Sequence, residues 1–269
     1  MEKIARQLIE SATLRITGAG LALIIGLNSP ITAHADEAYA KNLLKSMSDY
    51  MSAQKNISFN YDTDYEVTTK EKQKLALSAS GTTVISRPDK IRNTRASGFV
   101  DMEILFDGKT LTLFGKNVNA YTQVEVPGTL DNLIDVLRKK YDRPLAGADL
   151  FVSNPQASLM TGVNDIKDLG SGVISGVECD HLAFRTKEVD WQIWIAQGER
   201  PYPCRYVITS KRVEGGPQFS IRLSDWKTGN EVAADDFTFN NSTNAKKIDL
   251  KDLPNGDDLP KNFVKGPAK

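Results

Sequence analysis

Histidine and cysteine, on which many catalytic and metal-binding sites depend, are scarce in this chain. Its 269 residues include two of each, and no Gly-x-Ser-x-Gly turn is present to carry a nucleophilic serine. A histidine-based metal site needs three or four ligands. These absences favour a protein that is not an enzyme and that uses no metal or cofactor.

An excess of positive charge is also lacking. Lysine plus arginine number 34 and aspartate plus glutamate number 34, so the formal net charge is zero. Proteins that bind nucleic acid usually carry a basic patch or stripe. We therefore expect no nucleic-acid partner.

The N-terminal residues have the pattern of a cleavable secretory signal peptide. Basic residues begin it, the apolar stretch 16–27 follows, and Ala33-His34-Ala35 fits the small-x-small cleavage rule. The apolar stretch is shorter than the about 20 residues of a membrane-spanning helix. We predict that residues 1–35 are removed and that the exported protein has no transmembrane segment.

The exported chain would contain 269 − 35 = 234 residues, a length that suits one β-rich domain. We place this domain at residues 36–250. The remaining residues, 251–269, are rich in Lys, Asp, Gly and Pro and are interpreted as a polar C-terminal tail.

Cys179 and Cys204 are the two cysteines, and an exported protein makes a disulfide between them the first expectation. If they lie on the first and third of three consecutive strands, they are about 10 Å apart. A disulfide needs Cα atoms within about 7 Å. A bend at Pro201–Pro203 would bring Cys204 closer, so a disulfide and two free thiols both stay open.

Alternating runs of apolar and polar residues predict antiparallel strands in the first half of the chain. In 56–67, Phe59, Tyr61 and Tyr65 face one way, and acidic or amide side chains face the other. Asp107-Gly108 is a strong hairpin turn. The predicted strands are 56–67, 75–85, 90–96, 99–106, 110–114 and 118–126.

Four further runs between Val177 and Trp226 predict a second meander, because turn-forming residues separate them. A final short strand is predicted at 237–239. The sequence thus predicts a mainly β protein (α+β) with about ten antiparallel strands in one domain.

Helical patterns are confined to three segments. Residues 36–53 have apolar side chains at helical spacing, and Thr129 can cap a helix over 130–141. Asn154-Pro155 can begin another short helix within the apolar segment 145–163. We expect the helices and loops of 130–163 to lie over an opening of the sheet.

Candidate catalytic groups are isolated from one another. His181 is the one histidine left after cleavage, and it neighbours Asp180 without an adjacent nucleophile. The acidic pairs Asp235-Asp236 and Asp257-Asp258 lack the spacing of a calcium loop. A structural or solvated role is the simpler interpretation of each group.

Aromatic residues are concentrated on the predicted strands, and some strands carry bulk on both faces. In 189–195, Trp191 and Ile193 share a face while Trp194 lies on the other. Bulk on both faces indicates that helices or a second layer cover part of the sheet. Two interpretations stay open, a filled core or a curved sheet whose concave side is an apolar pocket.

Four segments resemble a family of predicted periplasmic proteins that is similar in fold to the lipoprotein carrier LolA and its outer-membrane receptor LolB. They are Cys-Asp-His-Leu-Ala-Phe-Arg (179–185), Asp-Trp-Gln-Ile-Trp-Ile (190–195), Gly-Glu-Arg-Pro-Tyr-Pro (198–203) and Phe-Thr-Phe (237–239). The resemblance covers most of residues 36–250. It implies a periplasmic location and a strongly curved antiparallel half-barrel, with helices over a hydrophobic cavity on its concave side.

The resemblance also implies binding of an acyl chain or another apolar ligand instead of catalysis. A lipid or other hydrophobic small molecule is the expected partner. The alternative is a protein-interaction or envelope-stress sensor module that binds an envelope protein, and an envelope hydrolase comes third because acid–base residues are missing. The candidate ligand-binding residues share the inward face of the predicted strands: Phe59, Tyr61, Tyr65, Val100, Met102, Ile104, Phe106, Trp191 and Ile193.

Overall fold

Twelve strands form one sheet in the part of the chain that the structure describes. The computed structural model describes residues 31–141, 143, 145 and 147–253, and those from Ala33 onward belong to one compact unit. The first six strands are β1 (Asn56–Thr68), β2 (Lys74–Ser86), β3 (Lys90–Ser97), β4 (Asp101–Phe106), β5 (Thr110–Gly115) and β6 (Ala120–Glu125). The others are β7 (Asp165–Ile174), β8 (Val177–Arg185), β9 (Val189–Ala196), β10 (Pro203–Ser210), β11 (Gln218–Thr228) and β12 (Lys246–Lys247).

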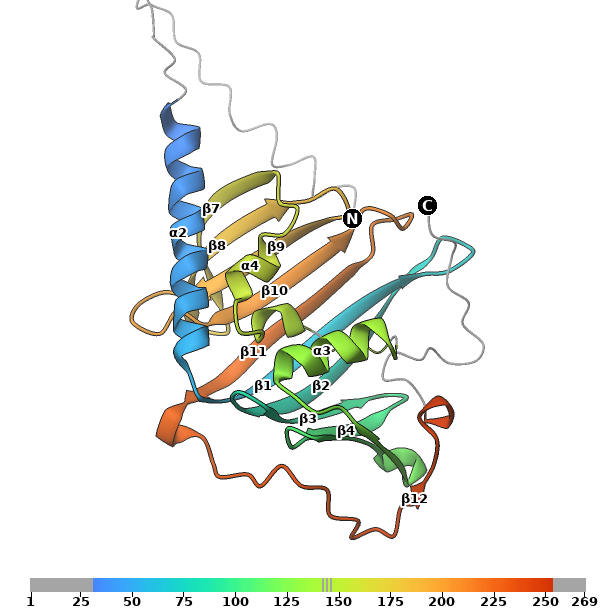
Figure 1. Cartoon of the computed structure of the whole chain (residues 1–269). Coiled ribbons are helices and arrows are strands. Elements are labelled where there is room, and N and C mark those ends of the chain that lie inside the picture. Colours follow the sequence, from blue (N-terminus) through green and yellow to red (C-terminus); the bar gives the residue numbers. More distant parts are fainter. Residues whose placement is uncertain (1–30, 142, 144, 146, 254–269) are drawn as a thin grey trace, which may run out of the picture. The chain divides into compact units, whose positions relative to one another are not determined.

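β1 joins two meanders into this one sheet (Figure 1). The strand order is β12-β6-β5-β4-β3-β2-β1-β11-β10-β9-β8-β7. β1 pairs antiparallel with β2 on one side and with β11 on the other. The first and last long strands of the domain are therefore neighbours, and the strands predicted as two separate meanders share one sheet.

The predicted mainly β, antiparallel architecture is confirmed, with twelve strands instead of about ten. β7 and β12 were not predicted, whereas the structure has no strand at 237–239. β7 contains Gly170 and Gly172, and its register shifts between Asp168 and Ser171, so the alternation that identifies a strand is broken. β12 has two residues and pairs parallel with β6.

The predicted strand at 237–239 is wrong. The Oδ1 atom of Asp235 accepts a hydrogen bond from the Phe237 main-chain N–H (2.7 Å), and that of Asp236 accepts one from Thr238 (3.0 Å). Phe237 has a positive φ of 56°, which no extended strand allows. Nearby carboxylates thus satisfy main-chain donors that a strand would offer to a neighbour.

The α-helices of the described residues lie on one face of the sheet (Figure 1): α2 (Ile31–Ala53), α3 (Leu130–Lys139) and α4 (Pro155–Leu159). Short 3-10 turns connect other elements: η1 (Lys116–Val118), η2 (Ala148–Leu150), η3 (Gly229–Glu231) and η4 (Leu250–Asp252). Both predicted caps are present. The side chain of Thr129 accepts from Asn132 N–H, and that of Asn154 accepts from Ala157 N–H.

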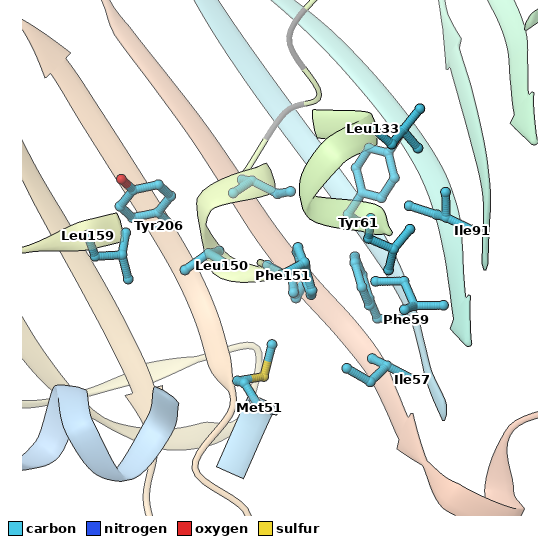
Figure 2. Close-up of a cluster of buried hydrophobic side chains, with 14 of the residues drawn as sticks. Met51, Ile57, Phe59, Tyr61, Ile91, Leu133, Leu150, Phe151, Leu159 and Tyr206 are labelled. Carbon is cyan, nitrogen blue, oxygen red and sulfur yellow. The ribbon is translucent and has the colours of Figure 1, made fainter. Parts of the chain in front are cut away.

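One hydrophobic core joins the helices to the sheet. Leu44, Met47 and Met51 of α2 are fully buried, and so is Leu133 of α3. They belong to the same cluster as the inward side chains of the strands, part of which Figure 2 shows. The spacing of the α2 residues keeps them on one side of the helix.

The predicted domain boundaries, at residues 36 and 250, stay predictions. Most of the predicted signal peptide, and the tail from residue 254, lie outside them. Leu253 is buried in the core cluster, so the chain stays attached to the domain as far as this residue. Cleavage before Asp36 stays a prediction.

Candidate functional site

A cavity of about 400 Å³ lies between α3 and the sheet. Inward side chains of β1–β5, β10 and β11 line it, together with α3 and residues between Arg143 and Phe151. Most of these side chains are apolar. The volume falls within the 300–1,000 Å³ that is typical of small-molecule sites.

The sheet bends strongly around this cavity. Seven strands that are consecutive in the sheet, in the order β5-β4-β3-β2-β1-β11-β10, all contribute to its lining. At about 4.8 Å per strand, these strands would extend over roughly 29 Å in a flat sheet. A cavity of this volume reaches all of them only because the strands curve toward the helices.

α3 covers the cavity because one side of the helix is apolar. Leu130, Leu133 and Ile134 line the cavity, whereas Asp135 forms exposed ion pairs with the following turn. The main-chain N–H of Leu130 donates to the carbonyl oxygen of Pro88 (2.9 Å). This bond ties the first turn of α3 to the β2–β3 turn.

Stacked aromatic rings connect the cavity to α2. Phe151 stacks on Phe59 with ring centroids 4.9 Å apart and an interplanar angle of 9° (Figure 2). Phe59 stacks on Trp226 (5.6 Å), and Trp226 stacks on Tyr202 (5.1 Å). The Nε1–H of Trp226 donates to the Tyr50 hydroxyl of α2 (3.2 Å). This column therefore links the segment after α3, the sheet and α2.

Polar side chains on β1–β3 interrupt the apolar lining. The Tyr61 hydroxyl donates to the main-chain oxygen of Thr94 (2.7 Å), and Asn93 Nδ2 donates to Thr83 Oγ1 (2.8 Å). A Cβ atom on Gly81 would lie 2.6 Å from the Tyr61 hydroxyl oxygen, so the glycine makes room for this bond. These partners offset the cost of burying the groups.

Three charged residues also line the cavity: Arg95, Arg143 and Asp149. Arg143 Nη2 donates to the carbonyl oxygens of Leu253 (2.6 Å) and Leu250 (3.3 Å). The turn η4 is thereby fixed beside the described residues of 143–151, which we call the lid segment.

The predicted ligand-binding residues divide into two groups. Five of them line the cavity: Phe59, Tyr61, Tyr65, Met102 and Ile104. Four lie outside its lining and are buried: Val100, Phe106, Trp191 and Ile193. Their roles in ligand binding all stay predictions.

Trp191 shows why the alternating sequence pattern could not distinguish residues that line the cavity from residues of the filled core. Its ring stacks on Phe184 (3.9 Å, 6°) and meets Tyr206 at 74° (5.7 Å). Leu159 of α4 lies over Tyr206 in Figure 2. The inward face is filled there, whereas it is hollow under α3, and the same alternating pattern fits both.

Arg95 and Arg143 were missed from sequence. Ile91, Asn93 and Arg95 occupy successive inward positions on β3, but this strand reads as a polar edge because its alternation is weak. Arg143 follows α3 in an irregular segment, and nothing in its sequence context indicates its position beside the cavity.

Cys179 and Cys204 are buried beside each other as free thiols. Cys204 lies in an irregularity of the β9–β10 register, between Pro203 and Arg205. The hydrogen bond with the Cys179 sulfur, together with burial, raises the pKa of the Cys204 thiol above its ordinary value. The disulfide itself stays a prediction.

His181 has structural partners. Its ring stacks on Trp194 (3.9 Å), and its Nε2 lies 2.9 Å from Oε1 of Gln192. Burial lowers the pKa of His181, which favours the neutral ring. The carboxylate of Asp180 accepts from Gln197 (2.8 Å).

The described part of the chain contains no group of three or more His, Cys, Asp or Glu side chains placed to hold a metal ion. It also contains no helix with the length and hydrophobicity needed to cross a membrane.

A family model described as "Predicted periplasmic protein (DUF2092)" matches residues 40–251. The chain belongs to this family. The family and the periplasmic location expected from the sequence are thereby confirmed. No curated protein matches the chain in sequence.

Several solved structures have a loosely similar fold. The lipoprotein LppX of Mycobacterium tuberculosis is 13% identical, with 73% of this chain and 100% of LppX covered and a TM-score of 0.43. MucB in the Pseudomonas aeruginosa MucA/MucB complex is 14% identical (75% and 61% covered, TM-score 0.41). A LolA superfamily protein of Nitrosomonas europaea is 12% identical (71% and 94% covered, TM-score 0.33). Likeness at this level says nothing about what this chain binds.

Proposed function

We propose that the protein binds an apolar ligand, such as an acyl chain, in the cavity beneath α3, without catalysing a reaction. The observation that carries the proposal is the cavity itself, about 400 Å³ between a curved sheet and an amphipathic helix. Apolar cavities with few polar groups suit ligands that gain from leaving water.

The hydrophobic effect predicts how affinity depends on chain length. Each methylene group removed from water contributes about 0.8 kcal/mol, which is roughly fourfold in affinity. We expect the dissociation constant to fall by about this factor per added methylene, until the chain fills the cavity. A flat dependence on length would mean that the chain binds outside an enclosed site.

A matched pair of variants tests whether the cavity is the site. Ala148 lines the cavity, whereas Ala183 does not and alternates with the inward Leu182 and Phe184 on β8. Ala148→Phe adds a ring to the cavity and should weaken uptake of a fatty acid by tenfold or more. Ala183→Phe adds the same ring elsewhere and should leave uptake unchanged.

Native mass spectrometry of protein purified gently from periplasm gives the direct measurement. A bound apolar molecule in wild type and Ala183→Phe, and its loss in Ala148→Phe, is the expected outcome. Retention of the same ligand by folded Ala148→Phe would contradict the assigned cavity. An apo mass together with no uptake of added fatty acid would overturn the proposal.

A protein-interaction or sensor module is the second candidate function. β7 ends the sheet, and Leu169 and Val173 on it are 47% and 66% exposed. Edge strands with exposed apolar residues offer pairing sites to other chains. If an envelope protein co-purifies and Val173→Lys releases it without changing fatty-acid uptake, the protein has this second role.

A further inference from the structure

Along β3 the lining of the cavity changes from apolar to charged. Ile91, Asn93 and Arg95 are successive inward residues of β3. Ile91 pairs with Ile85 of β2, and Asn93 pairs with Thr83. Four residues along a strand correspond to roughly 13 Å. The guanidinium-bearing position is therefore well separated from the apolar isoleucine pair.

Positive charge exceeds negative charge among the described lining residues. Arg95 and Arg143 contribute guanidinium groups, and Asp149 contributes the single carboxylate. The hydrogen bonds of Arg143 to two main-chain carbonyl oxygens leave its charge in place. Arg138 also lies 3.8 Å from Asp149 and offsets its charge.

Arg95 and Arg143 both interact with other groups of the protein. They act on a ligand through their positive charge, without the need for unused hydrogen-bond donors. A charge that borders an apolar cavity acts through a lower effective dielectric than a charge in water. It therefore favours a ligand with a negative group at that end, and it disfavours one with a positive group.

The volume limits the number of hydrocarbon chains. A water molecule takes roughly 30 Å³ of the liquid, and a methylene group is of similar size. About 400 Å³ thus holds roughly a dozen methylene groups. This volume matches much of one acyl chain and therefore favours a ligand with a single chain over a diacyl or triacyl lipid.

We propose that the ligand is a single-chain amphiphile with an anionic head group, a carboxylate or a phosphate. Its chain lies against Phe59, Ile91 and Phe151, and its head group lies beside Arg95 and Arg143. This inference rests on the proposed function, because it specifies the ligand of the same cavity.

The experiment compares head groups at constant chain length. Binding of dodecanoate, dodecyl phosphate and dodecanol to the delipidated mature protein is measured by calorimetry at pH 8. The anions are kept below their critical micelle concentrations, and the alcohol is kept below its solubility limit. We expect at least one anion to bind about tenfold more tightly than the alcohol, as one charge-assisted contact provides. The two anions separate carboxylate from phosphate recognition. A two-chain phosphatidylglycerol should bind weakly.

Three variants test whether Arg95 supplies the positive charge that favours the anion: Arg95→Gln, Arg95→Lys and the control Arg222→Gln. Arg222 is an exposed neighbour of the cavity residue Ile221 on β11, so alternation places it on the opposite face. Arg95→Gln should remove most of the preference for the anion while leaving dodecanol affinity within about twofold. Arg95→Lys should restore part of the preference, and Arg222→Gln should keep all of it.

Salt dependence provides a test that needs no variant. The preference of wild type for the anion should fall between 0.05 and 0.5 M salt, because screening weakens charge interactions at the rim.

The outcomes separate this inference from the proposed function. Equal binding of the anions and the alcohol would overturn the anionic head group but keep the apolar cavity. Tight, stoichiometric binding of the two-chain lipid would overturn the single-chain limit. No binding of any of these ligands would overturn the proposed function. An unchanged preference in folded Arg95→Gln would overturn the assigned position of the head group.

Discussion

Removing the ring of Phe151 is the most direct test of how the cavity is built. Phe151 follows η2, is 7% exposed, and stacks on Phe59 of β1. Phe59 in turn stacks on Trp226. Phe151→Ala therefore removes the contact through which the lid segment reaches the central strand of the sheet.

The magnitude follows from the surroundings of the ring. Replacing a buried phenylalanine by alanine usually costs about 3–5 kcal/mol. Phe151 borders the existing cavity, so fewer protein atoms contact its ring on that side. We therefore expect Phe151→Ala to lower the free energy of unfolding by about 3 kcal/mol, the lower end of the range. Phe151→Leu keeps apolar volume but loses the stack, and should cost about 1 kcal/mol.

A double-mutant cycle isolates the stacking itself. The free energies of unfolding of Phe151→Ala, Phe59→Ala and the double variant should show a coupling of about 0.5–1.5 kcal/mol. Urea unfolding followed by tryptophan fluorescence measures all three, because Trp226 contacts Phe59. A loss below about 1 kcal/mol for Phe151→Ala would show that the lid segment does not pack on β1 in solution. A coupling near zero would refute the stacked geometry.

Three further predictions concern other parts of the molecule. Cys179 and Cys204, buried side by side, should form a disulfide in the oxidising periplasm. Protein purified from periplasm, then unfolded and alkylated without reduction, should therefore carry no label on either cysteine. Full labelling of both cysteines under these conditions would contradict the disulfide. Burial lowers the pKa of His181, so its stabilising effect is full above the unfolded pKa of about 6.5 and is lost as the pH falls through the lower folded pKa. The urea midpoint should therefore fall between pH 8 and pH 5 in wild type and fall less in His181→Gln; equal slopes would refute this assignment. Arg92→Gln removes the hydrogen bonds to Asp235 at 2.6 and 3.0 Å, and should cost about 1–3 kcal/mol; hydrogen exchange should speed up around residues 235–238, and unchanged protection there would show that this ion pair does not hold the segment.

Much of the local structure could be predicted from the sequence. The alternation of 56–67 predicted β1, and the apolar spacing of 36–53 predicted most of α2. The caps at Thr129 and Asn154 marked where α3 and α4 begin. These signals are local, because each depends on residues within one or two turns or along one strand.

The misses arise where contacts distant in the chain replace local ones. β12 exists because Lys246 N–H donates to the Asn119 carbonyl oxygen (3.0 Å) and Ile248 N–H donates to that of Tyr121 (2.9 Å). No alternation in two residues can indicate such a pairing. Residues 237–239 alternate like a strand, but neighbouring carboxylates bind their main-chain donors instead.

The candidate site illustrates the same limit. Phe59 and Trp191 both point inward from aromatic-rich strands, and one lines the cavity while the other is packed among Phe184 and Tyr206. What differs between them is the surrounding packing: Phe59 is stacked by Phe151 from the segment after α3, beside the cavity, whereas Trp191 is packed by rings of the neighbouring strands. A strand pattern records which face of the sheet is apolar, but it contains no information about the distance to the opposing layer.

The sequence by itself determined the antiparallel strands, the helix caps and the apolar inward face, because propensity and periodicity act over a few residues. Its resemblance to known proteins in four segments indicated the family, which the family model confirms. Only the tertiary structure decided that β1 pairs with β11, and that the space under α3 is hollow and bordered by Arg95 and Arg143. These features depend on how segments far apart in the chain pack against one another. The pattern of residues along a single helix or strand does not contain this information.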